Sequence, residues 1–333
     1  MICVSGAELD SLLSQLKVTQ RAAFASGTYK NFATHWESYM LFCIHFGRSP
    51  LPASVESLCL FVQFLANSLK SANSVKNYLR GVKVLHLFAN QSVLAFDDFQ
   101  LSITLKGVSR NLKHVPRQAE PITVELLLEF RSLLDLNRPR HATFWCVLLL
   151  GFFCMLRKSN LVPDSQFDVG KQLCRSDIKA SDRCLLVTVK WSKTIQFSQK
   201  HLRIPVLAIP GSKLCPVAAY ANMTRLLPGD GSSPAFLCHR GSRVIPFSYA
   251  MLQSQLKALV KSTGRDPALY SSHSIRRGGA TAAFRARVPG ELIKVHGDRT
   301  SDAYLRYLHV PLEQRVEVAG RFRDFVKATE YNC

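Results

Sequence analysis

The sequence predicts a mainly α-helical protein with a small antiparallel β-sheet, an α+β fold in two domains. Three observations support this prediction. Apolar residues recur every three to four positions through roughly the first 110 residues, two short strand-like runs occur only after residue 180, and the apolar period lapses between the two parts at residues 109–121. A length of 333 residues also favours two domains, because domains of about 150 residues are common.

The first domain is expected to consist of helices, with clear examples at residues 31–46, 55–69 and 74–89. Each segment places apolar side chains at helical spacing, and strand signals are nearly absent. The third segment carries Lys76, Arg80 and Lys83 between its apolar positions. We place the first domain at residues 1–112, a linker at 113–121 and the second domain at 122–333.

The second domain is expected to combine helices with strands. A helical segment at residues 124–134 precedes an apolar run at 142–156, which is shorter than the ~20 residues of a membrane span and therefore indicates a buried helix. Residues 183–191 and 202–207 are predicted strands, flanking the basic hairpin WSKTIQFSQK. Helical spacing resumes at 249–262 and continues, with breaks, towards the end.

The charge of the chain indicates a polyanionic partner. Lys and Arg number 43 against 23 Asp and Glu, a formal net charge of +20 at pH 7. This balance favours nucleic acid first and an anionic membrane surface second. It argues against a cationic ligand.

The ten cysteines predict neither a disulfide framework nor a zinc site. They include no C-x-x-C pair, and no secretory leader is expected after Met1, where Glu8 and Asp10 interrupt the opening. A reducing, intracellular setting fits better, with most cysteines acting as small core residues. We therefore expect no metal and no cofactor.

The densest polar cluster is the stretch SSHSIRR at residues 271–277. Ser271 or Ser272 is a plausible helix N-cap, and three-residue spacing then places His273 and Arg276 on one face of the first turn. The free amides of that turn favour an anion. Taken alone, the pattern more often belongs to a capped helix with solvated charges.

Four further residues are candidates for chemistry. Arg157 directly follows the apolar run, at the rim of the core, although it could simply complement a helix dipole. Lys193 lies near the tip of the predicted hairpin, where lysines are usually solvated. Tyr304 and Tyr307 lie near the C-terminus and are by default packing aromatics.

Five of these residues, read in order, resemble the signature of the tyrosine recombinase (phage integrase) family: Arg157, Lys193, His273, Arg276 and Tyr307. The stretch HSIRRGGATAAFRARVPGELIKVHGDRTSDAYLRYLH looks most like the recombinases of DIRS and Crypton mobile elements. The resemblance covers most of the chain. It implies a helical, SAM-like core-binding domain that holds DNA, then a linker and a catalytic domain.

By this resemblance, Tyr307 is the nucleophile that attacks a DNA phosphodiester and forms a 3′-phosphotyrosyl intermediate, with Tyr304 as the alternative. The planar guanidinium groups of Arg157 and Arg276 would clamp the phosphate. His273 would act as acid and base, and Lys193 as general acid, because a phenol with a pKa of ~10 needs help to lose its proton.

The chain departs from the family pattern at two places. Relatives carry His or Trp about nine residues before the tyrosine, where this chain has Asp298 followed by Arg299, while His296 lies out of register. Asp298 and Arg299 are therefore further candidate catalytic residues. Asn160 stands where relatives often carry an acidic residue, three positions after the first arginine.

The expected partner is double-stranded DNA, bound by a homotetramer on synapsed sites, with a monomer or weak oligomer when free and no membrane contact. The candidate DNA-binding residues are Lys76, Arg80, Lys83, Lys113, Arg117 and Arg277. A location at DNA inside the cell is expected, in the nucleus if the host is eukaryotic. Two alternatives stay open: a catalytically inactive DNA-binding protein with the same fold, and a type IB topoisomerase-like relaxing enzyme.

Overall fold

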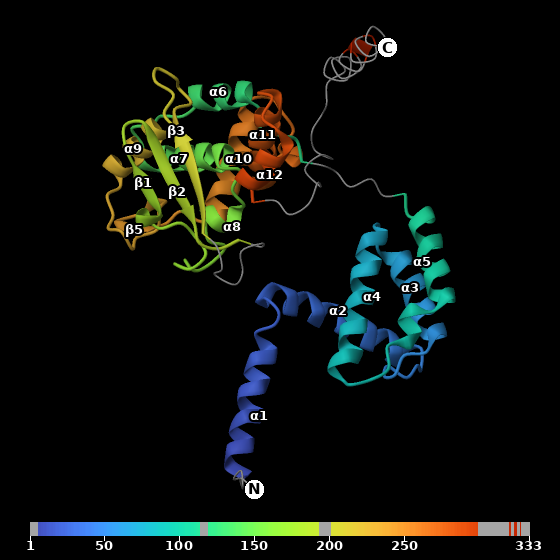
Figure 1. Ribbon diagram of the computed structural model, residues 1–333. Helices are drawn as coiled ribbons and strands as arrows, with labels where there is room; N and C mark the ends of the chain where they lie inside the picture. Colours follow the sequence, from blue (N-terminus) through green and yellow to red (C-terminus); the bar gives the residue numbers. More distant parts are fainter. Residues whose placement is uncertain are drawn as a thin grey trace. The chain divides into compact units, whose positions relative to one another are not determined.

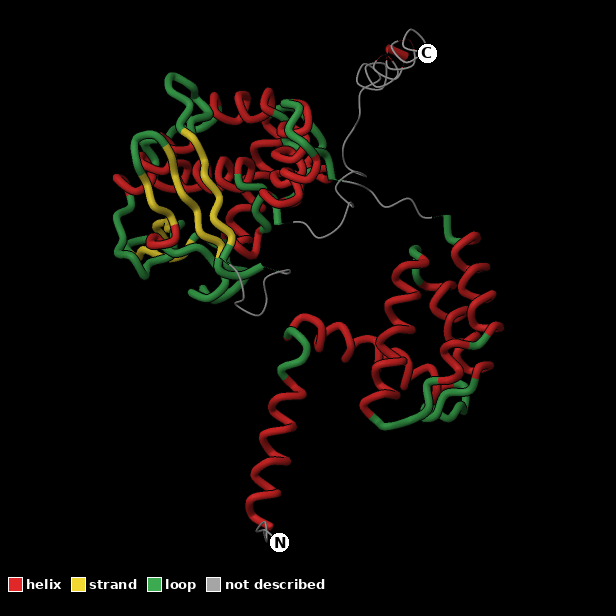
Figure 2. Tube along the Cα trace, viewed as in Figure 1, coloured by secondary structure: helices red, strands yellow, loops and turns green. Residues whose placement is uncertain are grey.

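The computed structural model describes residues 6–113, 119–192 and 201–298, together with Gly320, Arg323, Asp324 and Lys327. The chain divides into two compact units, Met1–Pro116 and Arg117–Cys333 (Figure 1). The described part of the first unit is helical, and the second unit combines helices with short strands (Figure 2).

The first unit is built from amphipathic helices. Its elements are α1 (Gly6–Arg21), α2 (Ser26–His45), α3 (Val55–Ser68), α4 (Ala72–Phe88), the 3₁₀ helix η1 (Leu94–Asp97) and α5 (Phe99–Asn111). The predicted helices at 31–46, 55–69 and 74–89 correspond to α2, α3 and α4. Ser54 caps α3 by accepting a hydrogen bond from the Ser57 amide, and Asp98 caps α5 in the same way.

Aromatic side chains fill the core of the first unit. Tyr39 and Phe42 of α2 meet Phe61 of α3, with ring centroids 5.1 and 5.2 Å apart. Val75 and Val82 of α4 are fully buried in the same cluster. The spacing of these residues along each helix is the periodicity that predicted the helices.

The second unit contains more elements than the sequence predicted. They are α6 (Val124–Ser132), α7 (Pro139–Phe153), α8 (Lys158–Leu161), η2 (Arg175–Asp177), β1 (Ile178–Ala180), β2 (Cys184–Val189), β3 (Leu202–Leu207), α9 (Pro216–Leu226), β4 (Leu237–Arg240), β5 (Arg243–Pro246), α10 (Tyr249–Ser262), η3 (Pro267–Leu269), α11 (Ser272–Arg285) and α12 (Gly290–His296). The predicted strands correspond to β2 and β3. The strands β1, β4 and β5 were missed because three or four residues are too few to show an alternating pattern.

The strands form two small antiparallel sheets rather than the single sheet expected. One has the order β1-β2-β3, and the other is the hairpin β4-β5. In the larger sheet, Leu185 pairs with Val206 and Val187 with Ile204, and these four side chains face the core. One side of the sheet is therefore buried, as antiparallel sheets commonly are.

Helix α7 is the centre of the second unit. All its residues from Ala142 to Phe152 are buried, which explains why the sequence shows no polar face there. The helix ends at Phe153, three residues before the predicted end at Leu156, because the chain turns with Met155 in the left-handed region at φ 49°. Arg157 consequently lies in an extended segment after the turn and not on the helix.

Among the residues that the structure describes, no helix has both the length and the hydropathy needed to cross a bilayer. The eight described cysteines are all unpaired, and six are buried: Cys43, Cys146, Cys154, Cys174, Cys215 and Cys238. They behave as core residues, as expected for most of them.

Candidate active site

Three of the five residues that resemble the catalytic set line one pocket. The pocket has a volume of about 180 Å³ and is lined by Leu156, Arg157, Lys158, Ser159, Ser272, His273 and Arg276. It lies where the turn after α7 meets the first turns of α11. Residues far apart in the sequence are thus brought into one cationic site.

The start of α11 is fixed by reciprocal capping. The Ser271 hydroxyl accepts a hydrogen bond from the His273 amide at 3.2 Å, and the Ser274 hydroxyl accepts one from the Ser271 amide at 3.0 Å. The helix therefore begins at Ser272 with Ser271 as its cap, one of the two caps that the sequence offered. His273 and Arg276 then share the face that lines the pocket.

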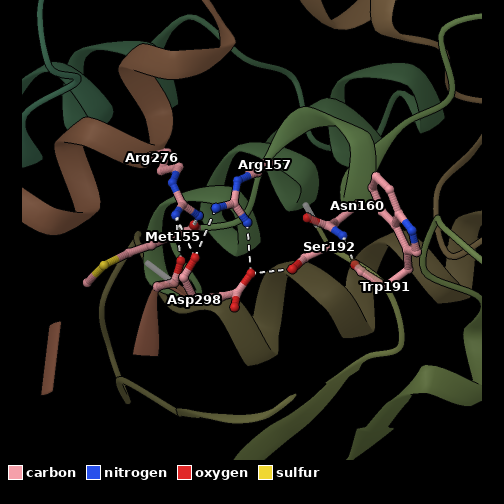
Figure 3. A network of polar contacts seen from close by, with 8 residues as sticks. Met155, Arg157, Asn160, Trp191, Ser192, Arg276 and Asp298 are labelled. Atoms are coloured by element: carbon pink, nitrogen blue, oxygen red, sulfur yellow. Dashed lines mark hydrogen bonds and ion pairs between the residues drawn. The ribbon is translucent and has the colours of Figure 1, made fainter. Parts of the chain in front are cut away.

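Arg157 is held by a residue from the other end of the unit. Its Nη1 atom donates to Asp298 Oδ2 at 2.8 Å, and its Nη2 atom donates to the Asp298 backbone oxygen at 3.0 Å (Figure 3). The Ser192 hydroxyl donates to the same carboxylate oxygen, Oδ2. Asp298, a departure from the family pattern that the sequence made a further candidate catalytic residue, is thus a centre of this network.

Arg276 points into the same network from α11. It donates through Nη1 to the Met155 backbone oxygen, and through Nη2 to the backbone oxygens of Gly297 at 2.5 Å and Asp298 at 3.4 Å. The two guanidinium groups therefore lie side by side around the Asp298 carbonyl (Figure 3). Two neighbouring guanidinium groups favour a ligand with delocalised negative charge.

His273 is exposed at the mouth of the pocket, but its environment favours the neutral ring. Loss of water contact on the pocket side lowers the pKa of His273 below its usual 6.5, and the positive charges of Arg276, Lys158, Arg157 and Arg277 lower it further. The ring is therefore neutral at pH 7 and able to accept a proton.

Two neighbouring side chains fix the backbone of the site. Asn160, buried, donates to the Trp191 backbone oxygen at 2.5 Å and so ties the segment after Arg157 to the segment that follows β2. The His296 Nε2 atom donates to the Phe153 backbone oxygen at 2.8 Å, which ties α12 to the end of α7. Asn160, at the family's acidic position, thus contacts the backbone, while the acidic partner of Arg157 is Asp298.

The remaining predicted site residues Lys193, Arg299 and Tyr307 lie outside the described residues, as do Tyr304 and Arg117. Ser192, the last described residue before Lys193, is buried beside Asp298. No local pattern in the sequence pointed to Ser192, because its contact partner is 106 positions away.

The described candidate DNA-binding residues differ in their surroundings. Lys76 and Arg80 are exposed on α4, and Lys113 is exposed just after α5. Lys83 forms an ion pair with Asp97 at 3.0 Å. Arg277 is half-buried and donates to the Ala119 backbone oxygen, so it holds the start of the second unit against α11. Within the described residues, no group of three or more His, Cys, Asp or Glu side chains is arranged as metal ligands would be.

No family model matches the sequence. The chain is 24% identical over 266 residues to an integrase/recombinase xerD homolog from Selenomonas ruminantium, covering 78% of this chain and 74% of the relative.

Solved structures of recombinases share the fold. The Tn1549 transposon integrase in complex with transposon right end DNA is similar with a TM-score of 0.60 at 16% identity, over 93% of this chain and 98% of the other. A lambda integrase dimer bound to a COC′ core site has a TM-score of 0.58 at 15% identity, over 90% of this chain and 94% of the other. The XerH site-specific recombinase bound to its difH substrate has a TM-score of 0.53 at 18% identity, over 80% of this chain and 70% of the other.

Proposed function

We propose that this chain, which has the fold of the tyrosine recombinases and resembles them in sequence over most of its length, is a site-specific DNA recombinase that breaks and rejoins DNA. The observation that supports this most directly is the convergence of Arg157, His273 and Arg276 on one pocket. These are residues whose order in the sequence already resembled the family signature.

The two arginines would bind the scissile phosphate. Negative charge grows on the non-bridging phosphate oxygens as the nucleophile attacks, and paired guanidinium groups offer planar donors to those oxygens. Both groups are held by backbone and carboxylate acceptors before DNA arrives, so little reorganisation is needed on binding. Arg299 is proposed as a further donor to the phosphate.

The proposed reaction is transfer of the phosphoryl group from a DNA 5′ oxygen to a tyrosine. The Tyr307 hydroxyl oxygen attacks phosphorus and gives up its proton to neutral His273, while the bond to the 5′ oxygen breaks and that oxygen takes a proton from Lys193. The product is a 3′-phosphotyrosyl linkage and a free 5′-hydroxyl. A 5′-hydroxyl from the partner strand then reverses the attack and rejoins the DNA without ATP.

The first unit would hold duplex DNA through Lys76, Arg80, Lys83 and Lys113, and the second through its pocket, Arg117 and Arg277. Supporting this assignment are the net charge of +20 and the exposure of Lys76, Arg80 and Lys113. The division of the chain at Pro116 supports treating residues 1–112 and 122–333 as separate domains joined by a linker.

We further propose that four copies assemble on synapsed DNA, while the free protein is a monomer or weak oligomer. Supporting this are apolar surfaces that the first unit leaves exposed. Helix α1 exposes Leu9, Leu12, Leu13 and Leu16, each at about half of its accessible surface, which form one stripe at helical spacing. Exposed apolar stripes are typical of association surfaces.

The substrate class that we propose for this enzyme is the ends of a mobile element. This proposal rests on the resemblance to DIRS and Crypton recombinases and on the similarity to a transposon integrase. Integration or excision of such an element would take place at chromosomal DNA, in the nucleus of a eukaryotic host.

Covalent trapping tests the proposed function. A pool of nicked duplexes with randomised sequence is incubated with the full chain, and DNA that stays attached to protein after denaturation is recovered and sequenced. In a nicked duplex the released fragment is lost, so the linkage accumulates. We expect recovery of a defined sequence as a protease-trimmable adduct. A chain that binds duplex DNA but never becomes linked would instead be the catalytically inactive DNA-binding protein.

A further inference from the structure

We infer that Asp298 is a positioning residue for DNA cleavage, holding the Arg157 guanidinium in the orientation that binds the scissile phosphate. This inference rests on the proposed function. It goes beyond it by giving an acidic side chain a defined task in a site that otherwise collects cations.

The contacts of the Asp298 side chain are specific. Oδ2 accepts from Arg157 Nη1 at 2.8 Å and from the Ser192 hydroxyl (Figure 3). The exposed fraction is 26% for the Arg157 side chain and 18% for that of Asp298, so the ion pair is mostly shielded from water. Hydrogen bonds between charged groups are stronger in such a place than on an open surface.

This one carboxylate joins three segments of the chain. Arg157 comes from the extended segment before α8, Ser192 from the segment after β2, and Asp298 from the turn after α12. Ser192 directly precedes Lys193, and Asp298 lies nine positions before Tyr307. The Asp298 carboxylate therefore connects the Arg157 segment, the segment after β2 and the turn after α12.

The charge of the site favours an anion near the arginines. The Nη2 atoms of Arg157 and Arg276 both donate to the Asp298 carbonyl, at 3.0 and 3.4 Å, so two like charges lie close together. Their mutual repulsion would turn the Arg157 side chain away from the pocket if nothing opposed it. The Asp298 carboxylate opposes it from the side of Nη1.

Holding Arg157 and binding a phosphate are compatible. A guanidinium group has five N–H donors, and Asp298 accepts two from Arg157, which leaves three for a phosphate. A fixed guanidinium loses less conformational freedom when it binds than one that swings in solvent. For this reason we assign Asp298 the task of holding Arg157 in place, and we do not treat it as a competitor of the phosphate for this arginine.

The backbone of Asp298 determines which variant is informative. Its φ is 47°, in the left-handed region, which Asp and Asn tolerate better than other side chains with a Cβ. Asp298→Asn therefore keeps the backbone preference and the shape, removes the negative charge and replaces one acceptor oxygen by an amide donor.

The test compares Asp298→Asn with the wild type in single-turnover linkage to a nicked duplex that the wild type cleaves. With DNA at saturation, we expect the linkage rate to fall about tenfold or more, because a hydrogen bond to a charged group contributes enough to change a rate by that factor. The dissociation constant for DNA should change less than about threefold. Asp168→Asn, which removes an exposed partner of Lys171, is the matched control and should leave both values unchanged.

A double-mutant cycle separates positioning from a general structural role. If Asp298 acts through Arg157, Asp298→Asn should slow the Arg157→Lys variant far less than it slows the wild type. An additive loss in the cycle, an unchanged rate or a faster rate in Asp298→Asn would each overturn the inference, and a faster rate would identify Asp298 as a competitor of the phosphate. If the wild type itself forms no linkage, the proposed function fails, and this inference fails with it.

Discussion

Gly279 of α11 packs against the backbone oxygen of Phe152 in α7 so closely that a Cβ atom at this position would overlap it. Gly278 has the same relationship with the backbone oxygen of Ile122. The Gly279 contact brings α11 against α7, and the Gly278 contact brings it against the segment before α6, next to the position where Arg276 reaches the Met155 carbonyl. The paired glycines after the two arginines in RRGG are thus part of what places Arg276 in the site.

Gly279→Ala is expected to destabilise the second unit. The obstacle is backbone, which cannot rotate away, so the helices must separate. We expect the free energy of unfolding to fall by about 1–3 kcal/mol, measured by urea denaturation. Gly107→Ala is the matched control, because Gly107 is also helical and nothing lies within 4 Å of the place that an added methyl group would take. That variant should be unchanged or slightly more stable, and equal losses in both would contradict the packing argument.

Arg157→Lys should separate charge from geometry. Lysine keeps the positive charge but loses the planar donors that bind Asp298 and, in our proposal, the phosphate. We expect about 10²-fold slower covalent linkage with nearly unchanged DNA affinity, measured under single-turnover conditions. Arg225→Lys, on the exposed side of α9, should behave as the wild type. A full-rate Arg157→Lys enzyme would show that point charge alone is needed.

Substitution of the two tyrosines should identify the nucleophile. Tyr307→Phe keeps the ring and removes the oxygen that would bond to phosphorus, so we expect normal folding and DNA binding with no covalent adduct. Tyr304→Phe should still form the adduct on the same nicked duplex. If only Tyr304→Phe abolishes the linkage, Tyr304 is the nucleophile, and the assignment of Tyr307 is wrong.

The lowered pKa of His273 predicts how stability depends on pH. Below pH 6.5 the unfolded chain takes up a proton at this residue that the folded chain resists, because burial and then Arg276, Lys158, Arg157 and Arg277 disfavour the charged ring. This contribution to stability is therefore complete above about pH 6.5 and is lost as the pH falls towards the folded-state pKa.

The measurement compares denaturation midpoints at about pH 7.5 and about pH 5.5 for the wild type and His273→Gln. The wild type should lose more stability on acidification than the variant. His273→Gln should also slow the covalent linkage, since Gln cannot accept the proton of the tyrosine. Parallel acid losses in the two proteins would show that His273 does not titrate as described.

Salt dependence should reveal the phosphate contacts of α4. Each phosphate contact releases counterions, so log affinity for duplex DNA falls with log salt by about 0.9 per contact. Lys76→Ala and Arg80→Ala, at exposed positions, should each lower the slope by about that amount and weaken binding. Lys261→Ala, exposed near the end of α10, is the control. A slope that stays the same in both α4 variants would remove this helix from the DNA interface.

Local features of this protein were predictable from the sequence. The helices α2, α3, α4 and α10 follow from apolar spacing, and the start of α11 follows from Ser271, because a cap and the amides it satisfies lie within four residues. Net charge, and with it the class of partner, is a sum over residues and needs no structure. The ordered set Arg157, His273 and Arg276 was recognisable as a family pattern.

Other features were decided only by the tertiary structure. Three of them depend on partners far away in the chain. They are the end of α7 before Met155, the strands β1, β4 and β5, and the contacts of Asp298 with Arg157 and Ser192. Asp298 looked like a defect of the pattern, since no local spacing shows that its carboxylate meets an arginine 141 positions away. Periodicity and capping record interactions along one segment, whereas an ion pair between segments exists only once the core that holds them has formed.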